Sequence, residues 1–164
     1  MPEIRKAVIE DLSRIMEIYG IAQEYMISHG NPTQWAHHYP SPELINDDIR
    51  KGNCYLVVEE NIIHGVFVLC EGEEPTYTNI FNGAWFNNDP YVTIHRIASD
   101  GAAHGIFHCV VEYAKRKADN VRIDTHENNL TMQHLIEKNG FVKCGTITVR
   151  DGSPRVAFQW VRNG

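Results

Sequence analysis

The sequence predicts an α/β fold: a mixed sheet of six or seven strands with helices on both of its faces. The chain has 164 residues, of which 43% are hydrophobic and 22% charged, a balance typical of one globular domain. Stretches of β-branched residues alternate with stretches whose apolar residues lie three and four apart, in the order β, α, α, β, β, β, α, β, α, β, β. A strand–helix–strand unit over residues 91–126 requires parallel pairing, whereas strands joined by tight turns pair antiparallel. We therefore expect a single domain over residues 1–164.

The N-terminal part is expected to form a short strand and two helices. Residues 4–9 form the strand, and Asp11 then opens a helix that Gly30 ends. Ser41, followed by a proline, is a typical N-cap, so a second, short helix begins there and stops by Gly52. The first helix carries one apolar stripe, formed by Leu12, Ile15, Met16, Tyr19, Ala22, Tyr25 and Met26.

The middle of the chain predicts a hairpin, an irregular stretch and a strand that leads into a helix. Residues 54–71 form the hairpin, which turns at Glu60 and Asn61. Residues 72–90 are irregular, and residues 91–99 form the next strand. A helix begins at Gly105, with one face formed by Ile106, Phe107, Val110, Val111, Ala114 and Ala118.

The C-terminal part predicts a strand, a helix and a closing hairpin. The strand covers residues 121–126. Asn128 or Asn129 caps the helix that follows, and Asn139 with Gly140 ends it. The hairpin then turns at residues 151–154.

Composition and charge exclude several classes of partner. The net charge is −6, which argues against nucleic acid and mildly favours a neutral or cationic small substrate. No apolar run is long enough to cross a bilayer, and the N-terminus lacks the plan of a signal peptide, so we expect a cytoplasmic protein without membrane contact. The cysteines are far apart and predict reduced thiols rather than disulfides or a zinc site: Cys54, Cys70, Cys109 and Cys144.

The turn between residues 99 and 105 is a candidate anion site. The strand stops at Ser99, Asp100 and Gly101, and a helix begins at Gly105. The first N–H groups of a helix have no internal partner and carry partial positive charge, so a phosphate fits there where side chains are small. No nucleotide-binding fingerprint is present. From these residues alone, an anion site and a simple glycine turn are about equally supported.

Two motifs resemble those of the GNAT superfamily of acetyl-CoA-dependent N-acetyltransferases. The first is the strand HRIAS at residues 95–99, followed by AAHGIF at residues 102–107. The second is NNLTMQHLIEKNGF at residues 128–141. Ala102 and Phe107 stand where the family carries Gln or Arg and Gly or Ala, and the spacing of Phe107 with Val111 and Ala114 also fits the helix core. The resemblance implies a GNAT-like sheet whose two central parallel strands splay apart.

The resemblance also implies how acetyl-CoA, used as co-substrate without a metal, is held. Backbone N–H groups of the loop would bind the pyrophosphate, and the strand before it would pair with the pantetheine through its backbone. Asn129 and Met132, at the start of the helix after residues 121–126, would approach the pantetheine as well. The loop and strand residues implied are Ile97, Ala98, Ser99, Ala102, Ala103, His104, Gly105 and Ile106.

In this family an amine attacks the thioester directly, which requires a base and an oxyanion donor. A backbone N–H near residues 97–99 is the donor that the resemblance implies. The candidate bases are five side chains: His95, Asp124, His126, Glu127 and Glu71. Each has a structural alternative, as a partner for a neighbouring loop. By this resemblance, Ile136 occupies the position of the tyrosine that serves the family as general acid for the leaving thiolate. A thiol with a pKa of about 8.5 can leave as thiolate without such an acid.

Aromatic and acidic side chains are candidates for the acceptor site. Trp35, Tyr39 and Trp85 either line the pocket or seal loops against the core. Glu71, with Glu73 and Glu74, could attract a cationic amine or form a solvated turn. His37 and His38 are adjacent and point different ways on regular structure, and the HENNL stretch lacks the second histidine of a zinc helix, so no metal site is expected.

The sequence therefore favours an N-acetyltransferase that acts on the primary amine of a small molecule. A protein acetyltransferase, acting on an α-amino group or a lysine, is the first alternative. A CoA-binding domain without catalysis is the second. A homodimer is left open as a partner arrangement.

Overall fold

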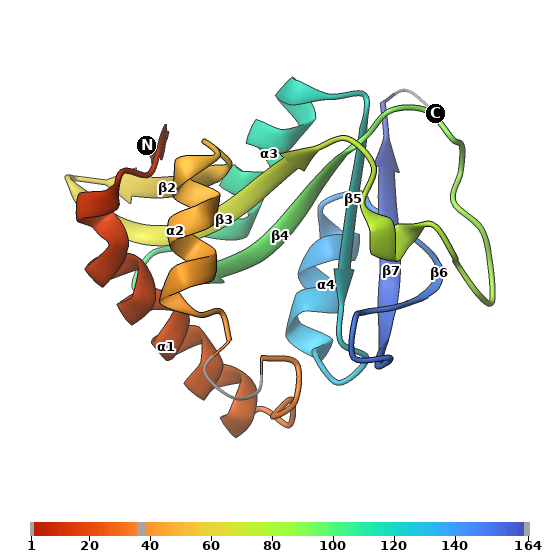
Figure 1. Ribbon diagram of the computed structural model, residues 1–164, viewed down its shortest axis with the longest axis horizontal. Coiled ribbons are helices and arrows are strands. Elements are labelled where there is room, and N and C mark those ends of the chain that lie inside the picture. Colours follow the sequence, from red (N-terminus) through yellow and green to blue (C-terminus); the bar gives the residue numbers. More distant parts are fainter. Residues whose placement is uncertain (1, 36–38, 163–164) are drawn as a thin grey trace. The chain divides into compact units, whose positions relative to one another are not determined.

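The computed structural model describes residues 2–35 and 39–162, which form seven strands, four α-helices and two 3₁₀ turns (Figure 1). Their order along the chain matches the predicted order. The elements are β1 Glu3–Lys6, η1 Ile9–Asp11, α1 Leu12–Ser28, α2 Pro42–Arg50, β2 Cys54–Glu59, β3 Ile62–Glu71, η2 Pro75–Tyr77, β4 Val92–Ser99, α3 Ile106–Lys117, β5 Asn120–Thr125, α4 Leu130–Lys138, β6 Val142–Thr148 and β7 Pro154–Val161.

The strands form one mixed sheet in the order β1-β2-β3-β4-β5-β7-β6, which confirms the predicted fold class. Pairing is antiparallel between β1 and β2, β2 and β3, β5 and β7, and β6 and β7, and parallel between β4 and β5. The parallel ladder joins Val92 to Val121 and Thr93 to Arg122. The ladder thus has two residue pairs, although β4 has eight residues and β5 has six.

The chain folds into two compact units, each built from separate segments. The first unit comprises Met1–Leu69 and His95–Tyr113, and the second comprises Cys70–Ile94 and Ala114–Gly164. The end of β4, the following loop and the start of α3 therefore belong to the first unit, and β5 and α4 belong to the second.

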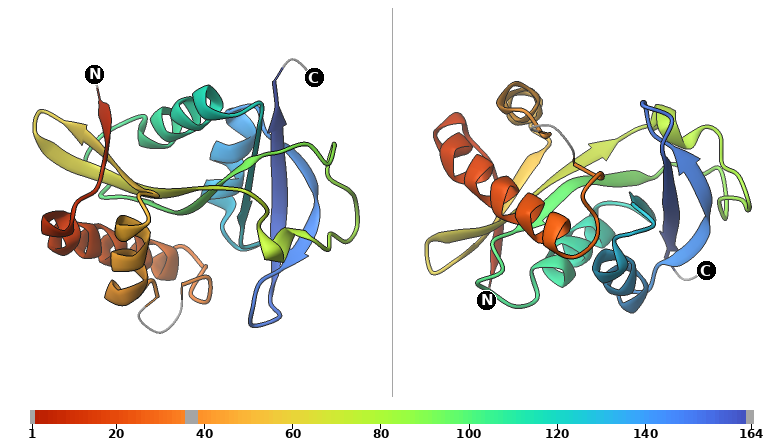
Figure 2. Two further views of the ribbon diagram at one scale, coloured as in Figure 1. Left: turned by 45° about the horizontal axis from the view of Figure 1, so that its top comes forward. Right: turned by 90° about the horizontal axis from the view of Figure 1, so that it is seen from below.

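In the first unit, the alternation of side chains along β2 and β3 explains why helices cover both faces (Figure 2). Leu56 and Val66 are buried against α1 and α2, where Ile15, Ile18 and Ile45 belong to the same core. On the opposite face, α3 approaches so closely that a Cβ atom on Gly65 would lie 2.7 Å from Cγ2 of Ile106. Gly65 is therefore a packing requirement of this unit.

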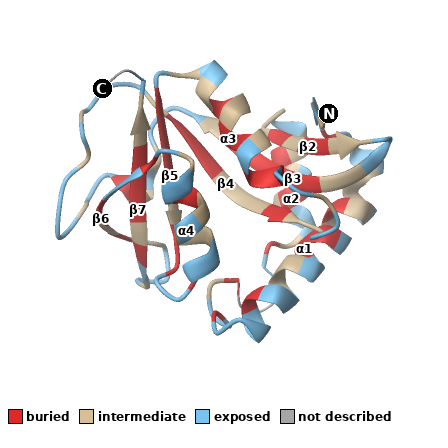
Figure 3. Ribbon diagram, turned by 180° about the vertical axis from the view of Figure 1, so that it is seen from behind, coloured by how far each residue is buried: buried red, intermediate tan, exposed pale blue. Residues whose placement is uncertain are grey.

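In the second unit, the core lies along β5 and β7, the strands that Figure 3 shows as largely buried. Tyr77, Ile147 and Ala157 form a buried cluster under the 72–91 segment. Ile136 of α4 and Phe158 of β7 are also buried, with at most 1% of their surface exposed.

The predicted helix caps and turns follow local chemistry. The Ser41 hydroxyl accepts the N–H of Leu44 at 3.1 Å, as a helix N-cap does. Glu60 and Asn61 both have positive φ, 52° and 64°, which is the backbone of a tight hairpin turn. Of the two asparagines that could cap α4, Asn129 is the cap.

Two predicted boundaries and part of one predicted helix face were wrong. The first strand ends at Lys6 rather than at residue 9, because the Asp11 carboxylate accepts the Val8 N–H at 2.8 Å and turns the chain into η1. Ile18 is buried in α1 although the predicted stripe omits it, and Tyr25 within that stripe is 44% exposed. His126 lies outside β5, which ends at Thr125.

The four cysteines are free thiols. No helix among the described residues is long and apolar enough to span a membrane.

Candidate active site

The segment that follows β4 is anchored by Asp100, whose side chain is 7% exposed. One carboxylate oxygen, Oδ2, accepts hydrogen bonds from Nη2 of Arg14 at 2.6 Å and from Nδ1 of His64 at 2.8 Å. The other oxygen, Oδ1, accepts the N–H of Ala102 at 2.9 Å, and the Asp100 N–H donates to the His64 carbonyl at 2.9 Å. The residue therefore ties the start of the loop to α1 and β3.

Burial alone would raise the pKa of the Asp100 carboxyl, because it disfavours the charged form. The hydrogen bonds from Ala102 and His64, together with the charges of His64 and Arg14, outweigh burial and bring this pKa below its ordinary value of 3.8. Asp100 is thus ionised at neutral pH. The sequence predicted a turn here but gave Asp100 no role in it. An aspartate at the start of a turn often accepts the N–H of the residue two positions later, as Asp100 does.

The loop ends in the exposed N-terminus of α3. Gly105 has φ +74°, which favours glycine, and open space surrounds the position that its Cβ would take. The first helical hydrogen bond runs from the Cys109 N–H to the Gly105 carbonyl at 3.0 Å. As a rule, the N–H groups in the first turn of a helix have no acceptor within that helix, so a helix N-terminus is suited to binding an anion.

The predicted cofactor residues of the first unit differ in burial and in whether their backbone N–H groups are already hydrogen-bonded. The Ala102 N–H is already engaged by Asp100, whereas Ala103, His104, Gly105 and Ile106 follow it toward the helix. On β4, Ala98 is buried in the core beside α1 and α2. Its neighbours Ile97 and Ser99 are half-buried and, by alternation, face the other way.

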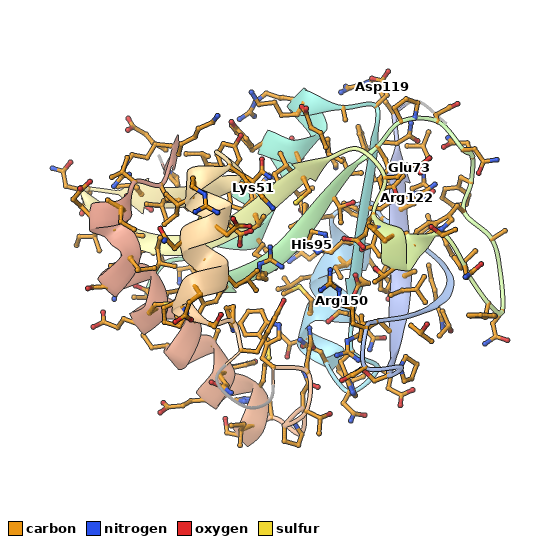
Figure 4. All side chains as sticks on the ribbon, viewed as in Figure 1. Lys51, Glu73, His95, Asp119, Arg122 and Arg150 are labelled. Carbon is orange, nitrogen blue, oxygen red and sulfur yellow. The ribbon has the colours of Figure 1, made fainter. Side chains whose placement is uncertain are left out.

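β4 departs from regular strand geometry next to these residues. Arg96 has φ +47°, its carbonyl accepts the Tyr19 hydroxyl at 2.7 Å, and its guanidinium pairs with Asp48. His95, the first predicted base, lies immediately before Arg96 and is half-buried (Figure 4). Tyr19, Asp48 and Arg96 were not among the predicted site residues.

In the second unit, the predicted base Asp124 accepts a hydrogen bond from the Tyr77 hydroxyl at 2.6 Å. Tyr77 is 2% exposed, and burial followed by the charge of Asp124 raises its pKa well above the ordinary value. The hydroxyl is therefore protonated and satisfied by the carboxylate. This arrangement corresponds to the structural alternative for Asp124.

His126 also makes a structural hydrogen bond. Its Nδ1 accepts the N–H of Asn128 at 3.0 Å, in the turn that precedes α4. Burial, reinforced by repulsion from Arg155, lowers its pKa below 6.5, so the ring is neutral at pH 7. Asp124 and His126 do not share a strand face, because His126 follows the end of β5.

The predicted residues at α4 have defined positions. Oδ1 of Asn129 accepts the Met132 N–H at 3.1 Å, so this side chain caps the helix. Met132 is half-buried. Ile136, at the position of the family's acidic tyrosine, is fully buried and supplies no proton donor.

The four predicted acceptor-site residues are placed differently. Trp35 is 7% exposed and packs edge-on against Tyr19, with ring centroids 5.5 Å apart, so it belongs to the core. Tyr39 is 38% exposed and its hydroxyl accepts from Arg96 at 3.3 Å. Trp85 donates its ring N–H to the Tyr77 carbonyl at 3.0 Å. Glu71 is exposed at the end of β3.

Arg122 of β5 is a buried cation that the sequence analysis did not identify (Figure 4). Its guanidinium carbon lies 4.0 Å from the Trp85 ring centroid and 3.9 Å from that of Tyr91. Its Nη2 donates to the Asn87 carbonyl at 2.9 Å. Trp85 therefore contacts protein on one side of its ring, which supports the alternative that it seals a loop.

Each unit has a pocket, and neither of these two pockets is lined by a predicted acceptor residue. A pocket of about 380 Å³ in the first unit is lined by Glu59, Glu60, His64, Ala102, Ala103 and His104. A pocket of about 470 Å³ in the second unit is lined by Phe86, Asn87, Gly140, Val142, Gln159 and Val161.

No group of three or more His, Cys, Asp or Glu side chains is placed to hold a metal ion within residues 2–35 and 39–162. His37 and His38 lie outside the described residues.

Comparison with known proteins finds relatives through structure rather than through sequence. No family model and no curated protein matches the chain. A GNAT family acetyltransferase from Streptococcus agalactiae 2603 superposes with a TM-score of 0.91 at 29% identity, covering 99% of this chain and 96% of that one. Agmatine N-acetyltransferase gives 0.63 at 11% identity, with coverage of 98% and 99%. Naa50 of Arabidopsis thaliana, in complex with a bisubstrate analogue, gives 0.62 at 13% identity, with 97% of each chain covered.

The mixed seven-stranded sheet matches the GNAT fold, and the likeness to the streptococcal enzyme supports an acetyltransferase. Near-complete coverage of both chains in the superposition on the streptococcal acetyltransferase extends this likeness over the whole fold. These likenesses support the GNAT superfamily, which the two motifs also indicate.

Proposed function

We propose that residues 1–164 form one domain that transfers an acetyl group from acetyl-CoA to the primary amine of a small molecule. The observation that carries this proposal is the N-terminus of α3, where His104 and Gly105 are exposed and open space surrounds the position that a Cβ of Gly105 would take. A pyrophosphate is the anion that such a cradle suits in an acetyltransferase.

The cofactor contacts follow from this placement. The N–H groups of residues 103–106 would hold the pyrophosphate, with Ala102 shaping the loop through Asp100. Ile97 and Ser99 would pair with pantetheine through their backbone, because residues two apart on a strand direct their N–H and C=O groups to the same edge. Asn129 and Met132 remain candidates for contact with the pantetheine. Bound acetyl-CoA supplies the activated acetyl group as a thioester.

His95 is the base that we favour. Asp124 and His126 both make structural hydrogen bonds, to Tyr77 and Asn128, whereas His95 lies on the strand proposed to carry the thioester. A histidine can accept the proton of an attacking amine near neutral pH. His95→Gln should lower kcat at least tenfold while leaving the affinity for CoA unchanged.

A small cationic amine is the acceptor class that we favour. The net charge of −6 attracts cations, and Tyr39 and Glu71 are exposed candidates for contact. A protein amine is the second candidate, because the fold is shared with Naa50 in complex with its bisubstrate analogue.

Calorimetry and a thiol-release assay test the proposal. Acetyl-CoA should bind, and thiol release should depend on one class among agmatine, aliphatic diamines, amino-acid amides and short peptides. Release with peptides alone would favour the protein acetyltransferase. Binding without release by any amine would indicate a CoA-binding domain, and no binding at millimolar acetyl-CoA would overturn the proposal.

A further inference from the structure

Arg96 adopts a backbone conformation that its side chain does not favour. Its φ of +47° lies in the left-handed region, although it stands within strand β4. Glu60 and Asn61, which share this sign of φ, form the hairpin turn. A residue held in such a conformation inside a strand requires surrounding contacts that fix it, and such positions cluster at functional sites.

The first of these contacts fixes the peptide plane after Arg96. The Tyr19 hydroxyl of α1 donates to the Arg96 carbonyl at 2.7 Å. Tyr19 is 2% exposed, and Trp35 packs edge-on against its ring. The peptide bond to Ile97 is trans, so its C=O and N–H point in opposite directions. With the carbonyl held toward α1, the Ile97 N–H points away from α1.

The second contact fixes the Arg96 side chain. Its Nε and Nη2 donate to the two carboxylate oxygens of Asp48 at 3.0 and 2.8 Å. The side chains of Arg96 and Asp48 are 15% and 7% exposed, so water competes weakly with this bidentate pair. Asp48 lies on α2, whose first turn Ser41 caps. The left-handed residue is therefore held from both α1 and α2.

We propose that Tyr19 and the Arg96–Asp48 pair are positioning residues that aim the Ile97 N–H at the developing oxyanion. The inference rests on the proposed acetyl transfer. In that step the amine nitrogen bonds to the thioester carbon, and the C=O electron pair moves to oxygen, which accepts the N–H. Collapse re-forms the C=O, breaks the C–S bond and releases CoA as thiolate, while the base takes the ammonium proton. A donor fixed in advance stabilises that intermediate without reorganising.

Tyr19→Phe tests the first contact, because it removes only the hydroxyl. We expect kcat to fall about tenfold, part of the 10²–10³ typical of losing an oxyanion donor, with the KM for acetyl-CoA changed less than about twofold. Tyr25→Phe, on the same helix and 44% exposed in the wild type, is the matched control and should leave kcat unchanged.

Asp48→Asn and Asp48→Ala test the second contact. Asn retains an acceptor for the guanidinium, so kcat should fall less with Asn than with Ala. Asp47→Asn, at a neighbouring surface ion pair with Lys51, should leave kcat unchanged. Each variant is assayed with the amine that gives the fastest thiol release.

Unchanged kcat in Tyr19→Phe, with active wild-type enzyme, would overturn the inference, and so would a parallel loss of kcat and acetyl-CoA affinity. Absence of acetyl-CoA binding by the wild type would instead overturn the proposed function. If no amine supports turnover, crystal structures decide: in the Tyr19→Phe, Asp48→Ala double variant, Arg96 should revert to negative φ. Retention of φ near +47° there would contradict the inference.

Discussion

Asp100 illustrates how a single residue can set the geometry of a binding loop. Its carboxylate is nearly buried and accepts from Arg14, His64 and the Ala102 N–H together. A charge in this position is stable only while its donors remain in place, because removing one partner leaves the other group poorly solvated. The loop start is therefore linked electrostatically to α1 and β3.

The pH dependence of stability follows from this environment. The pKa of Asp100 is lowered on folding, so its stabilising contribution is complete above about pH 4 and is lost as the pH falls through the folded value. Asp100→Asn should lower the free energy of unfolding by about 1–3 kcal/mol at pH 7. That difference from the wild type should shrink as the pH falls below 3.8, the ordinary value. Urea unfolding between pH 3 and 7 measures it.

Asp119→Asn is the control for that series. Asp119 pairs with Arg162 at the surface and its side chain is 79% exposed, so we expect a change below about 0.5 kcal/mol. An Asp100→Asn difference that stayed constant down to pH 3 would contradict the role assigned to the charge.

Gly105 is the residue at which a substitution should affect the cofactor most directly. Gly105→Glu places a carboxylate beside the proposed pyrophosphate and forces a side chain into φ +74°. We expect loss of CoA binding by calorimetry. Gly152→Glu introduces the same side chain at φ +85° in an open hairpin turn, and it should retain CoA binding. Equal CoA affinity in the two variants would show that CoA does not bind at the loop that contains Gly105.

At the scale of elements, the outer edge of β6 is protected by a loop. Phe81 and Thr146 exchange two backbone hydrogen bonds at 2.8 Å, which covers part of the edge strand. The loop approaches so closely that a Cβ on Gly83 would lie 1.9 Å from the Cys144 carbonyl oxygen. Glycine is required there for space, and the covered edge is less open to pairing with another chain.

Gly83→Ala should therefore detach this loop from β6. We expect the free energy of unfolding to fall by about 2 kcal/mol or more, because the clash is with backbone that cannot rotate away. Gly72→Ala, at φ +85° in open space, is the control and should cost only about 1 kcal/mol. Equal losses in the two variants, measured by urea unfolding, would contradict the packing role of Gly83.

At the scale of the whole molecule, chain connectivity builds each compact unit from separate segments. The boundaries fall at 69–70, within β3, at 94–95, within β4, and at 113–114, within α3. The proposed cofactor residues are distributed over both units: residues 97–106 belong to the first, and Asn129 and Met132 to the second. A ligand that binds the folded chain and not the unfolded one stabilises it against unfolding.

Acetyl-CoA should accordingly raise the melting temperature. A ligand at 100 times its Kd adds about 2.7 kcal/mol to stability, which corresponds to roughly 5–10 °C for a chain of this size. Differential scanning fluorimetry measures the shift, and Gly105→Glu should abolish it. An equal shift in that variant would indicate that CoA binds elsewhere.

The predictable parts of the fold depended on local chemistry. Apolar spacing located the helices, Ser41 and Asn129 marked their starts, and Glu60 with Asn61 marked a hairpin. The β4–helix motif and the helix before Phe141 indicated the superfamily that the structural comparison supports. Each of these signals acts over a few residues, so the sequence contains it directly.

Asp48 and Arg96, 48 positions apart, form a buried pair, and Tyr19 meets the Arg96 carbonyl from 77 positions away. No periodicity in one sequence encodes such contacts, because they arise only when α1 and α2 pack on the sheet. Likewise, His126 was predicted as a strand residue but lies in a turn, and the sequence left open whether Trp35 lines a pocket or packs on the core, where the structure buries it. The sequence by itself determined the order of elements and the class of chemistry. Tertiary packing decided which polar groups are buried together, since that depends on contacts between residues distant along the chain.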